Sequence, residues 1–425
     1  MIARLARSLP FFYGWIIVAV AFVTMAIGVN ARTAFSLLFP PILAEFGWER
    51  GVTAGAFSFG FLVSAVLSPT LGRVMDRHGP VWVMEAGALA IAAGMVLATF
   101  ATAPWHLYAT LGMLVGGGSV ATGYAGQGLY LPNWFARRRA LAISIAYAGA
   151  GAGSILILPY VQVLIAGSGW RSACFAMAGL VLLLVPLNLL VRHRPQDLGL
   201  TPDGDSAAVA ARRSRVRVVD AAWAAQDWTL SRAMRTARFW WVGLGFFGAL
   251  YAWYAVQVHQ TKYLVDIGFA PDTAAWVLGV VSLAGIPGQI AMGALSDRIG
   301  REPIWIAGCV GFVATYALLI ALEAHPYPAL LWLMALAQGT LGYGVTSVLG
   351  PVVAEIFEGP HFGAIFGTVM MAAVTGGAAG PWLTGILHDH SGSYLTGFLV
   401  AGACSLVSAF AIWMAAPRTI RRVGA

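Results

Sequence analysis

The sequence predicts an all-α membrane protein with twelve transmembrane helices arranged as two halves of six. Apolar residues make up 59% of the 425 residues and charged residues only 10%, which is far outside the composition of a soluble globular domain. Apolar stretches of about twenty residues recur almost from end to end, and each is long enough to cross a hydrocarbon layer of about 30 Å. A polar segment near the middle separates the two halves.

The expected spans follow one another closely along the chain. The first begins only after Arg4 and Arg7, covers a full bilayer and lacks a small-residue cleavage site behind a short apolar core, so we expect it to stay in the mature protein. The twelve ranges are 13–33, 52–72, 80–102, 105–132, 140–165, 171–191, 239–262, 273–295, 303–322, 328–352, 362–387 and 393–415.

The basic residues predict the orientation of these spans. Almost all of them fall on even-numbered connections or near the termini, and the exceptions are Arg32, Arg50, Arg171 and Lys262. Because short cytoplasmic loops retain Lys and Arg, both termini are expected in the cytoplasm. The formal charge of +8 then reflects topology and anionic lipid and argues against a nucleic-acid partner. The expected location is a plasma membrane, specifically a bacterial inner membrane.

Residues 192–238 differ from the rest because they are polar, contain prolines and glycine, and carry a cluster of arginines. They divide the chain into an N-terminal six-helix bundle over 1–191, a cytoplasmic linker over 192–238 and a C-terminal six-helix bundle over 239–425. The end of the linker, Trp228–Arg238, is compatible with a short amphipathic helix on the membrane surface. A partly disordered linker is the alternative for 203–222.

A short internal repeat supports the division into halves. The sequence GRVMDRHG follows the second span and GALSDRIGR follows the eighth, at equivalent positions. Glycine lets helices approach closely and the chain turn, while the acid can cap a helix N-terminus and the arginine can form an ion pair. The repeated residues are Gly72, Asp76 and Arg77 in the first half and Gly293, Asp297 and Arg298 in the second.

This repeated motif resembles the signature loops of the major facilitator superfamily. The resemblance covers nearly the whole chain and implies two pseudo-symmetric bundles around a central cavity that opens alternately to each side of the membrane. Three further stretches resemble the branch of monocarboxylate transporters and oxalate/formate exchangers: Tyr13–Trp15, Asn133–Ala142 and Gly376–Pro381. In the second stretch, Arg137, Arg138 and Arg139 are expected to anchor topology and pair with acids of nearby loops.

The resemblance fails at two positions where it implies functional charges in the eighth span. Alignment on Ala291-Met292-Gly293 places Gln289 where the branch has a carboxylate-binding arginine and Gly285 where it has a proton-relaying acid. The eleventh span, 362–387, also lacks the lysine implied by the oxalate carriers. An ordinary proton-coupled lactate carrier is therefore not expected.

Arg32 is the main candidate for binding an anionic substrate. A basic side chain within a span costs about 2.5–3.5 kcal/mol, so one that persists there usually faces a cavity and has a function. The family's substrate-binding lysine would fall near Arg32 and aligns better with Thr33. The alternative is that Arg32 is structural and extends to the outer membrane interface.

Further candidates to line a cavity are polar and aromatic side chains within the spans. In the seventh span Tyr251 and Tyr254, and likewise Gln257 and Gln260, are three residues apart and fall on similar faces of the helix. A histidine in the same span could carry a proton, although a structural hydrogen bond is its commoner role. The seventh span contributes Tyr251, Tyr254, Gln257 and His259, and the other spans contribute Tyr124, Gln127, Tyr147, Gln289 and Tyr343.

Several kinds of chemistry have no counterpart in the sequence. There is no nucleotide-binding Gly-Lys-Ser/Thr motif, no metal-ligand cluster and no recognisable nucleophile with its base, so we expect no cofactor and no enzyme. A transporter of a small organic anion, a mono- or dicarboxylate, is the favoured hypothesis. The alternatives are an exporter of a neutral or amphiphilic compound and a non-transporting sensor of the same fold. Besides lipid and substrate no partner is implied, and a monomer is the working expectation.

Overall fold

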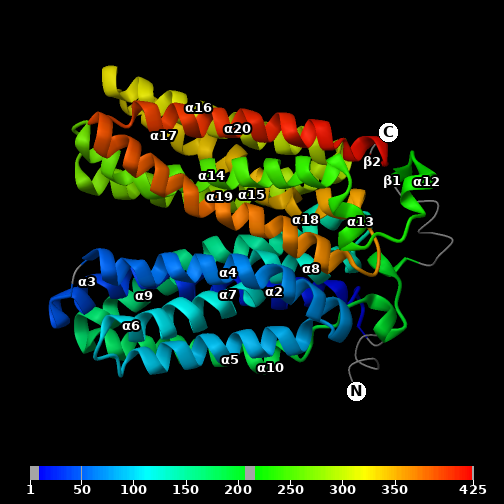
Figure 1. The fold of residues 1–425 in the computed structure, drawn as a ribbon, viewed down its shortest axis with the longest axis horizontal. Coiled ribbons are helices and arrows are strands. Elements are labelled where there is room, and N and C mark those ends of the chain that lie inside the picture. The colour runs from blue at the N-terminus through cyan, green and yellow to red at the C-terminus, as the bar shows by residue number, and fades with distance from the viewer. Residues whose placement is uncertain (1–8, 49, 206–215, 424–425) are drawn as a thin grey trace. The chain divides into compact units, whose positions relative to one another are not determined.

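The computed structural model describes residues 9–48, 50–205 and 216–423, and these form two compact units (Figure 1). Unit 1 comprises Met1–Ser214 together with His361–Thr368, and unit 2 comprises Arg215–Pro360 together with Val369–Ala425. Each unit is a bundle of helices, as expected for chain segments that must satisfy all their backbone hydrogen bonds inside a membrane.

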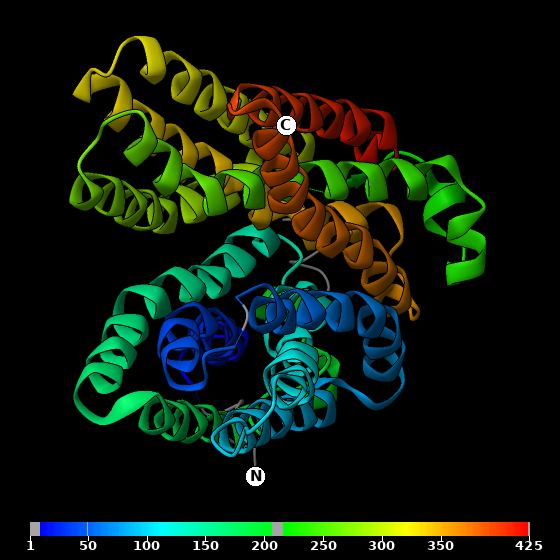
Figure 2. The ribbon, with the colours of Figure 1, turned by 60° about the vertical axis from the view of Figure 1, so that its left-hand side comes forward.

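Unit 1 contains the helices of the first half of the chain. Figure 2 shows that α9 runs round the outside of α2, along which it packs. The elements are α2 (Gly14–Thr33), α3 (Phe35–Phe46), α4 (Arg50–His78), α5 (Pro80–Ala98), α6 (Pro104–Leu107), the π-helix η1 (Tyr108–Val115), α7 (Gly116–Thr122), α8 (Tyr124–Trp134), α9 (Arg139–Leu182), α10 (Leu184–Asn188) and the 3₁₀ turns η2 (Pro195–Leu198) and η3 (Pro202–Gly204).

Unit 2 contains the helices of the second half, and α19 enters it after beginning in unit 1. Its elements are β1 (Val216–Val218), α12 (Ala221–Ala224), α13 (Leu230–Met234), α14 (Ala237–Asp266), α15 (Pro271–Ile299), α16 (Arg301–Ala324), α17 (Pro328–Leu336), the π-helix η4 (Ala337–Gly342), α18 (Gly344–Ile356), α19 (Phe362–Ser391), α20 (Leu395–Ala415), the 3₁₀ turn η5 (Pro417–Thr419) and β2 (Arg421–Val423).

Within the described residues, ten continuous helical segments are long and apolar enough to cross a membrane. One of them, Arg139–Asn188, holds two spans, because the backbone leaves the helical region at Gly169, where φ is +83°. The fourth span is the broken series α6, η1, α7 and α8, which changes direction at Gly123. The expected twelve-helix, two-bundle fold is confirmed.

The first span is longer than the sequence pattern indicated. Instead of ending at residue 33, it continues as α3 to Phe46 and covers 33 residues in all. The extension is apolar despite Pro40 and Pro41, and it ends where Gly47 adopts a left-handed conformation with φ of +64°. Glycine tolerates this conformation because it has no Cβ, which makes it a common helix terminator.

The fourth and tenth spans each contain a π-helical segment, η1 and η4, that the sequence did not predict. In the fourth span the segment leads into a glycine run that packs tightly against α4. A Cβ added to Gly116 would lie 2.5 Å from the Cα of Gly60, so only glycine permits this approach. Small residues therefore bring the helices together here, which is the usual basis of helix packing in membranes.

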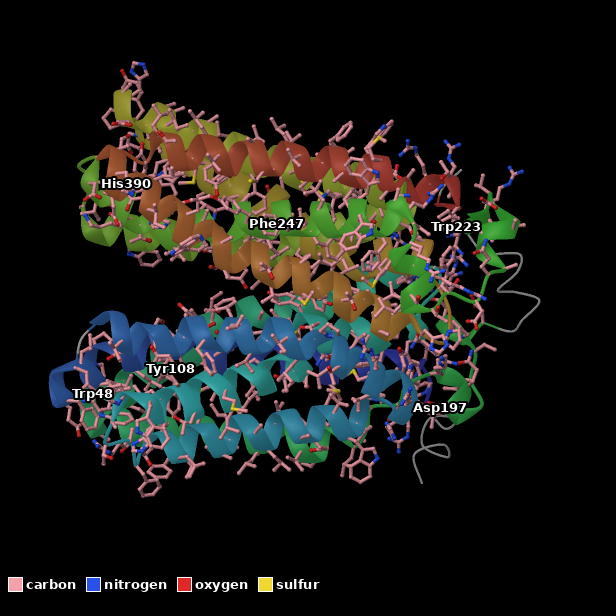
Figure 3. All side chains as sticks on the ribbon, in the orientation of Figure 1. Trp48, Tyr108, Asp197, Trp223, Phe247 and His390 are labelled. Atoms are coloured by element: carbon pink, nitrogen blue, oxygen red, sulfur yellow. The ribbon has the colours of Figure 1, made fainter. Side chains whose placement is uncertain are left out.

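The second part of the linker and the end of the chain are folded together on unit 2. Strand β1 pairs with β2 in antiparallel register, with Arg217 opposite Arg422. The indole of Trp223 donates to the carbonyl of Ile356 at 2.8 Å. Figure 3 labels Trp223 and His390 at opposite ends of this unit. The short helix expected over 228–238 is α13, whereas Arg238 belongs to the first turn of α14.

Candidate functional site

Arg32 lies within the first helical segment, because α2 and α3 together run from Gly14 to Phe46. A side chain at the end of a span can reach the interface by extending along the helix. At about 1.5 Å per residue this helical segment is about 50 Å long, which exceeds a hydrocarbon layer of about 30 Å. Arg32 follows Gly14 by about 18 residues, or about 27 Å, so the binding role and the structural role both remain predictions.

The guanidinium of Arg32 is held against α4. Its central carbon lies 3.5 Å from the ring centre of Phe61 and 5.6 Å from that of Phe57, and Nη1 donates to the hydroxyl of Ser64 at 3.4 Å. The Ser64 hydroxyl in turn donates to main-chain carbonyls, including that of Gly116 at 2.8 Å. Sequence reasoning did not single out these three partners, because their role depends on how α4 is rotated toward α2.

The candidates in the fourth and fifth spans make hydrogen bonds within unit 1. The hydroxyl of Tyr147 donates to the carbonyl of Tyr124 at 2.8 Å, and the two rings meet edge to face at 4.9 Å. Gln127 is fully buried, and its side-chain oxygen accepts a hydrogen bond from the hydroxyl of Tyr130. The Tyr147 contact joins α9 to α8, whereas the contact between Gln127 and Tyr130 lies within α8.

In unit 2 the candidates Gln257 and Tyr343 form a pair. The amide of Gln257 donates to the hydroxyl of Tyr343 at 3.1 Å, and the Tyr343 ring packs 4.2 Å from that of Trp253. The same ring covers Gly285, where an added Cβ would lie 2.9 Å from it. An acidic side chain at this position, as in the family, would therefore collide with Tyr343 unless the ring moved. The absence of the acid is thus what allows the Tyr343 ring to pack against Gly285.

Gln289, which occupies the position of the family's arginine, is buried in unit 2. Its amide donates to the hydroxyl of Thr346 on α18, and its main-chain carbonyl accepts a hydrogen bond from Ser347 at 2.9 Å. This side chain connects α15 to α18 with neutral groups.

The remaining candidates on α14 have different surroundings. Tyr251 is buried, and Tyr254 packs against Gly377 of α19, where a Cβ would lie 2.7 Å from its ring. His259 is half-buried, with Nε2 2.9 Å from the carbonyl oxygen of Pro381 and its ring 5.4 Å from that of Tyr394. Gly377 of the eleventh span thus allows the ring of Tyr254 in the seventh span to pack closely against the backbone.

The first repeated motif caps a helix. The two carboxylate oxygens of Asp76 accept hydrogen bonds from the main-chain N–H groups of Gly363 and Ala364, both at 2.9 Å. These N–H groups lie in the first turn of α19, which has no partner for them within the helix. A Cβ on Gly72 would collide with the carbonyl of Gly363, and Arg77 is exposed.

The second repeated motif forms a buried ion cluster. Nη1 of Arg301 lies 2.6 Å from the Asp297 carboxylate, and its Nε lies 2.7 Å from the Glu355 carboxylate. All three side chains are at least nine-tenths buried, while Arg298 is exposed and Gly293 is buried. The arginine of this motif that pairs with acids is thus Arg301, the last residue of the sequence GALSDRIGR, which was not chosen from the pattern.

The arginine run makes hydrogen bonds that hold neighbouring loops of unit 1. Arg139 donates from Nε to the carbonyls of Pro132 and Phe135, both at 3.1 Å. The carboxylate of Asp203 accepts from the main-chain N–H of Arg137 at 2.8 Å. Arg137 also pairs with Asp205 at 3.4 Å, and Arg138 is exposed. The expected pairing of the run with acids of adjacent loops is seen for Arg137.

Comparison with known proteins shows the class to which this fold belongs. The sequence profile of the Major Facilitator Superfamily matches residues 17–265 and 242–423, which is most of the chain. The chain belongs to this superfamily, so it is a multi-pass membrane transporter of a small-molecule substrate and not an enzyme.

Among relatives, the chain is most usefully compared with monocarboxylate transporters. Monocarboxylate transporter 13 of Bos taurus is 30% identical over 391 residues, covering 92% of this chain and 86% of that protein. Monocarboxylate transporter 11 of Homo sapiens is 27% identical over 437 residues, covering 97% and 84%. The solved structure of a proton:xylose symporter superposes with a TM-score of 0.71 at 13% identity, covering 95% of each chain, which bears on the fold alone.

Proposed function

We propose that this transporter carries a small organic anion, a mono- or dicarboxylate, by alternating access of its two bundles, with Arg32 as the group that binds the anion. The observation that carries the proposal is the packing of the Arg32 guanidinium against α4, where it lies 3.5 Å from the ring centre of Phe61 and 3.4 Å from the hydroxyl of Ser64. A guanidinium among the transmembrane helices is costly unless it has a function, and its flat fork of N–H donors suits a carboxylate.

The surroundings of Arg32 support this role. The ring of Phe61 stacks on the guanidinium and stabilises its charge through a cation–π interaction, while Ser64 accepts one weak hydrogen bond. Both contacts are compatible with a positively charged guanidinium, which is the form that attracts an anion. The names of the relatives, monocarboxylate transporters, are consistent with such a substrate.

The proposed mode of energy coupling follows from two uncharged residues of α15. Gln289 and Gly285 replace the charged pair of the monocarboxylate branch, and both are built into neutral contacts. Transport is therefore proposed to proceed by exchange or facilitated diffusion, or with a proton carried by the substrate or by His259. A relay through a carboxylate within the spans is not part of this scheme.

We also propose a bacterial inner membrane as the location, with both termini cytoplasmic. This orientation rests on the distribution of arginines between the connections of the spans. The same distribution supports a cytoplasmic linker over 192–238 between bundles over 1–191 and 239–425.

Uptake of radiolabelled carboxylates into proteoliposomes tests the role of Arg32. Arg32→Gln is expected to lower saturable uptake tenfold or more, since a charge-assisted hydrogen bond contributes about 1.5–3 kcal/mol. Arg32→Lys should retain part of the activity because it keeps the charge. Lys262→Gln is the matched control, because Lys262 is exposed and pairs with Asp266. Uptake by Arg32→Gln equal to that of the parent would overturn the proposal.

A second candidate function is export of a neutral or amphiphilic compound. The group formed by Trp253, Gln257 and Tyr343 favours it, because it offers aromatic faces and an amide without a formal charge. In that case Gln257→Ala would weaken transport, whereas Arg32→Gln would leave it intact in a correctly folded protein.

A further inference from the structure

A small cavity lies beside Arg32 in the interior of unit 1. It has a volume of about 10 Å³, and its walls come from α2, α3, α4, α5 and η1. Apart from Arg32, the residues that line it are apolar, among them Phe57 of α4, Met95 of α5 and Leu111 of η1. A cavity of this size holds about one water molecule or a group of similar size, such as a methyl.

The cavity is reached from the side of Arg32 and Phe57. These two side chains are partly exposed, whereas Met95 and Leu111 are only 1% and 6% exposed. The central carbon of the Arg32 guanidinium lies 5.6 Å from the ring centre of Phe57, so the two groups lie at the same side of the cavity. An incoming molecule therefore meets the guanidinium first, and only its far end reaches Met95 and Leu111.

An apolar group is a better occupant of this cavity than water. Within the lining, all of which belongs to the described part of the chain, Arg32 carries the only polar side chain. Buried water molecules usually make about three hydrogen bonds, which the side chains of this lining do not supply. An apolar group instead restores the dispersion contacts that the walls of an empty cavity lose.

The π-helical segment η1 forms part of the wall. Leu111 and Val115, which both belong to η1, line the cavity. π-helical turns are rare and are found frequently at functional sites. The cavity therefore coincides with the irregular part of the fourth span.

We propose that this cavity receives the apolar tail of the carried carboxylate and limits that tail to the size of a methyl group, with Met95 as the residue that sets the limit. This inference rests on the proposed role of Arg32, which binds the carboxylate at the entrance while the tail lies against Met95 and Leu111. A hydroxyl on the tail loses its hydration there without gaining a partner. The transporter therefore selects an unsubstituted acid over a hydroxy acid of the same length.

Saturable uptake of radiolabelled acetate into proteoliposomes at neutral pH tests the selection. Protein-free liposomes give the background from diffusion of the uncharged acid, which is subtracted. In the parent, butyrate is expected to compete about tenfold less well than acetate, because the extra methylenes overpack a filled cavity. Lactate is expected to compete about tenfold less well than propionate, because its hydroxyl is buried without a partner.

Variants that enlarge the cavity should change the order of the acids. Met95→Ala should let butyrate compete better than acetate, since each methylene that then fits strengthens binding about fourfold. Met113→Ala is the matched control, because Met113 lies on η1 outside the lining and is 57% exposed, and it should keep the order of the parent. Leu111→Val enlarges the same cavity with a smaller change of volume, and it replaces Met95→Ala if that variant does not fold.

The outcomes separate this inference from the proposed function. Loss of saturable acetate uptake in Arg32→Gln, together with an unchanged order of acids in the folded cavity variant, would overturn the inference and leave the role of Arg32 intact. Uptake by Arg32→Gln equal to that of the parent would overturn the proposed function and the inference with it. A parent that takes up no acetate, or that prefers butyrate or lactate, would show that the cavity is an ordinary packing void.

Discussion

The carboxylate of Asp76 accepts a hydrogen bond from the main-chain N–H of Gly363 at 2.9 Å. This bond, with its neighbour to Ala364, places a negative charge at the N-terminus of α19, where the helix dipole is positive. α19 begins among the residues of unit 1 and continues in unit 2. We infer that release of this cap accompanies the conformational change of transport.

Asp76→Asn is expected to reduce turnover while leaving membrane insertion intact. The amide keeps one accepting oxygen but loses the charge, which weakens the cap by about 1–2 kcal/mol. If this end is cytoplasmic, the variant should favour the inward-open state, measured by labelling of engineered cysteines. Arg77→Gln, next to it and exposed, is the control. Unchanged transport together with unchanged labelling would contradict the prediction.

Glu355→Ala is expected to destabilise the protein strongly. It removes one of the two carboxylates that pair with the buried Arg301, while Asp297 stays paired, so the expected loss is that of a charge-assisted hydrogen bond, about 1.5–3 kcal/mol. A lower melting temperature in detergent would show the effect. Glu358→Ala is the matched control, because Glu358 is about half exposed and its pair with Arg421 contributes about 0–1 kcal/mol. Similar losses for the two variants would argue against a special role of the buried cluster.

His259→Gln should alter at most the pH dependence of flux. Glutamine can still donate to the carbonyl of Pro381, so the contact between α14 and α19 persists without a titratable group. Proteoliposome uptake under imposed pH gradients compares this variant with the parent and with Arg32→Gln. Strong proton-driven accumulation in His259→Gln, with a substrate that does not itself titrate, would mean that another residue carries the proton.

The proposed orientation is tested by substituting single cysteines into the protein and labelling them from outside intact cells. A cysteine at Asp205 in the linker should resist labelling from outside, but Asp205 is only 16% exposed and pairs with Arg137. Gln226 is exposed and is therefore a clearer site in the same linker. A cysteine at the exposed His325, between the ninth and tenth spans, should be labelled from outside. Efficient external labelling at Gln226 would refute the model of cytoplasmic termini.

The sequence by itself determined the class of fold and its repeat. Twenty-residue apolar stretches follow from the thickness of a bilayer, so they can be counted without any tertiary contact. The two copies of the loop motif, around Asp76 and Asp297, revealed the relation of the halves because glycine, acid and arginine recur at the same spacing.

Tertiary structure decided what the polar residues do. Asp76 and Asp297 occupy equivalent positions, yet one caps α19 and the other pairs with Arg301, because different backbone groups and charges lie within reach. The length of the first helical segment, which runs on to Phe46, depended on α3 continuing through two prolines. Hydrogen bonds and ion pairs act over about 3–4 Å, and only the packing of distant segments brings partners to that distance.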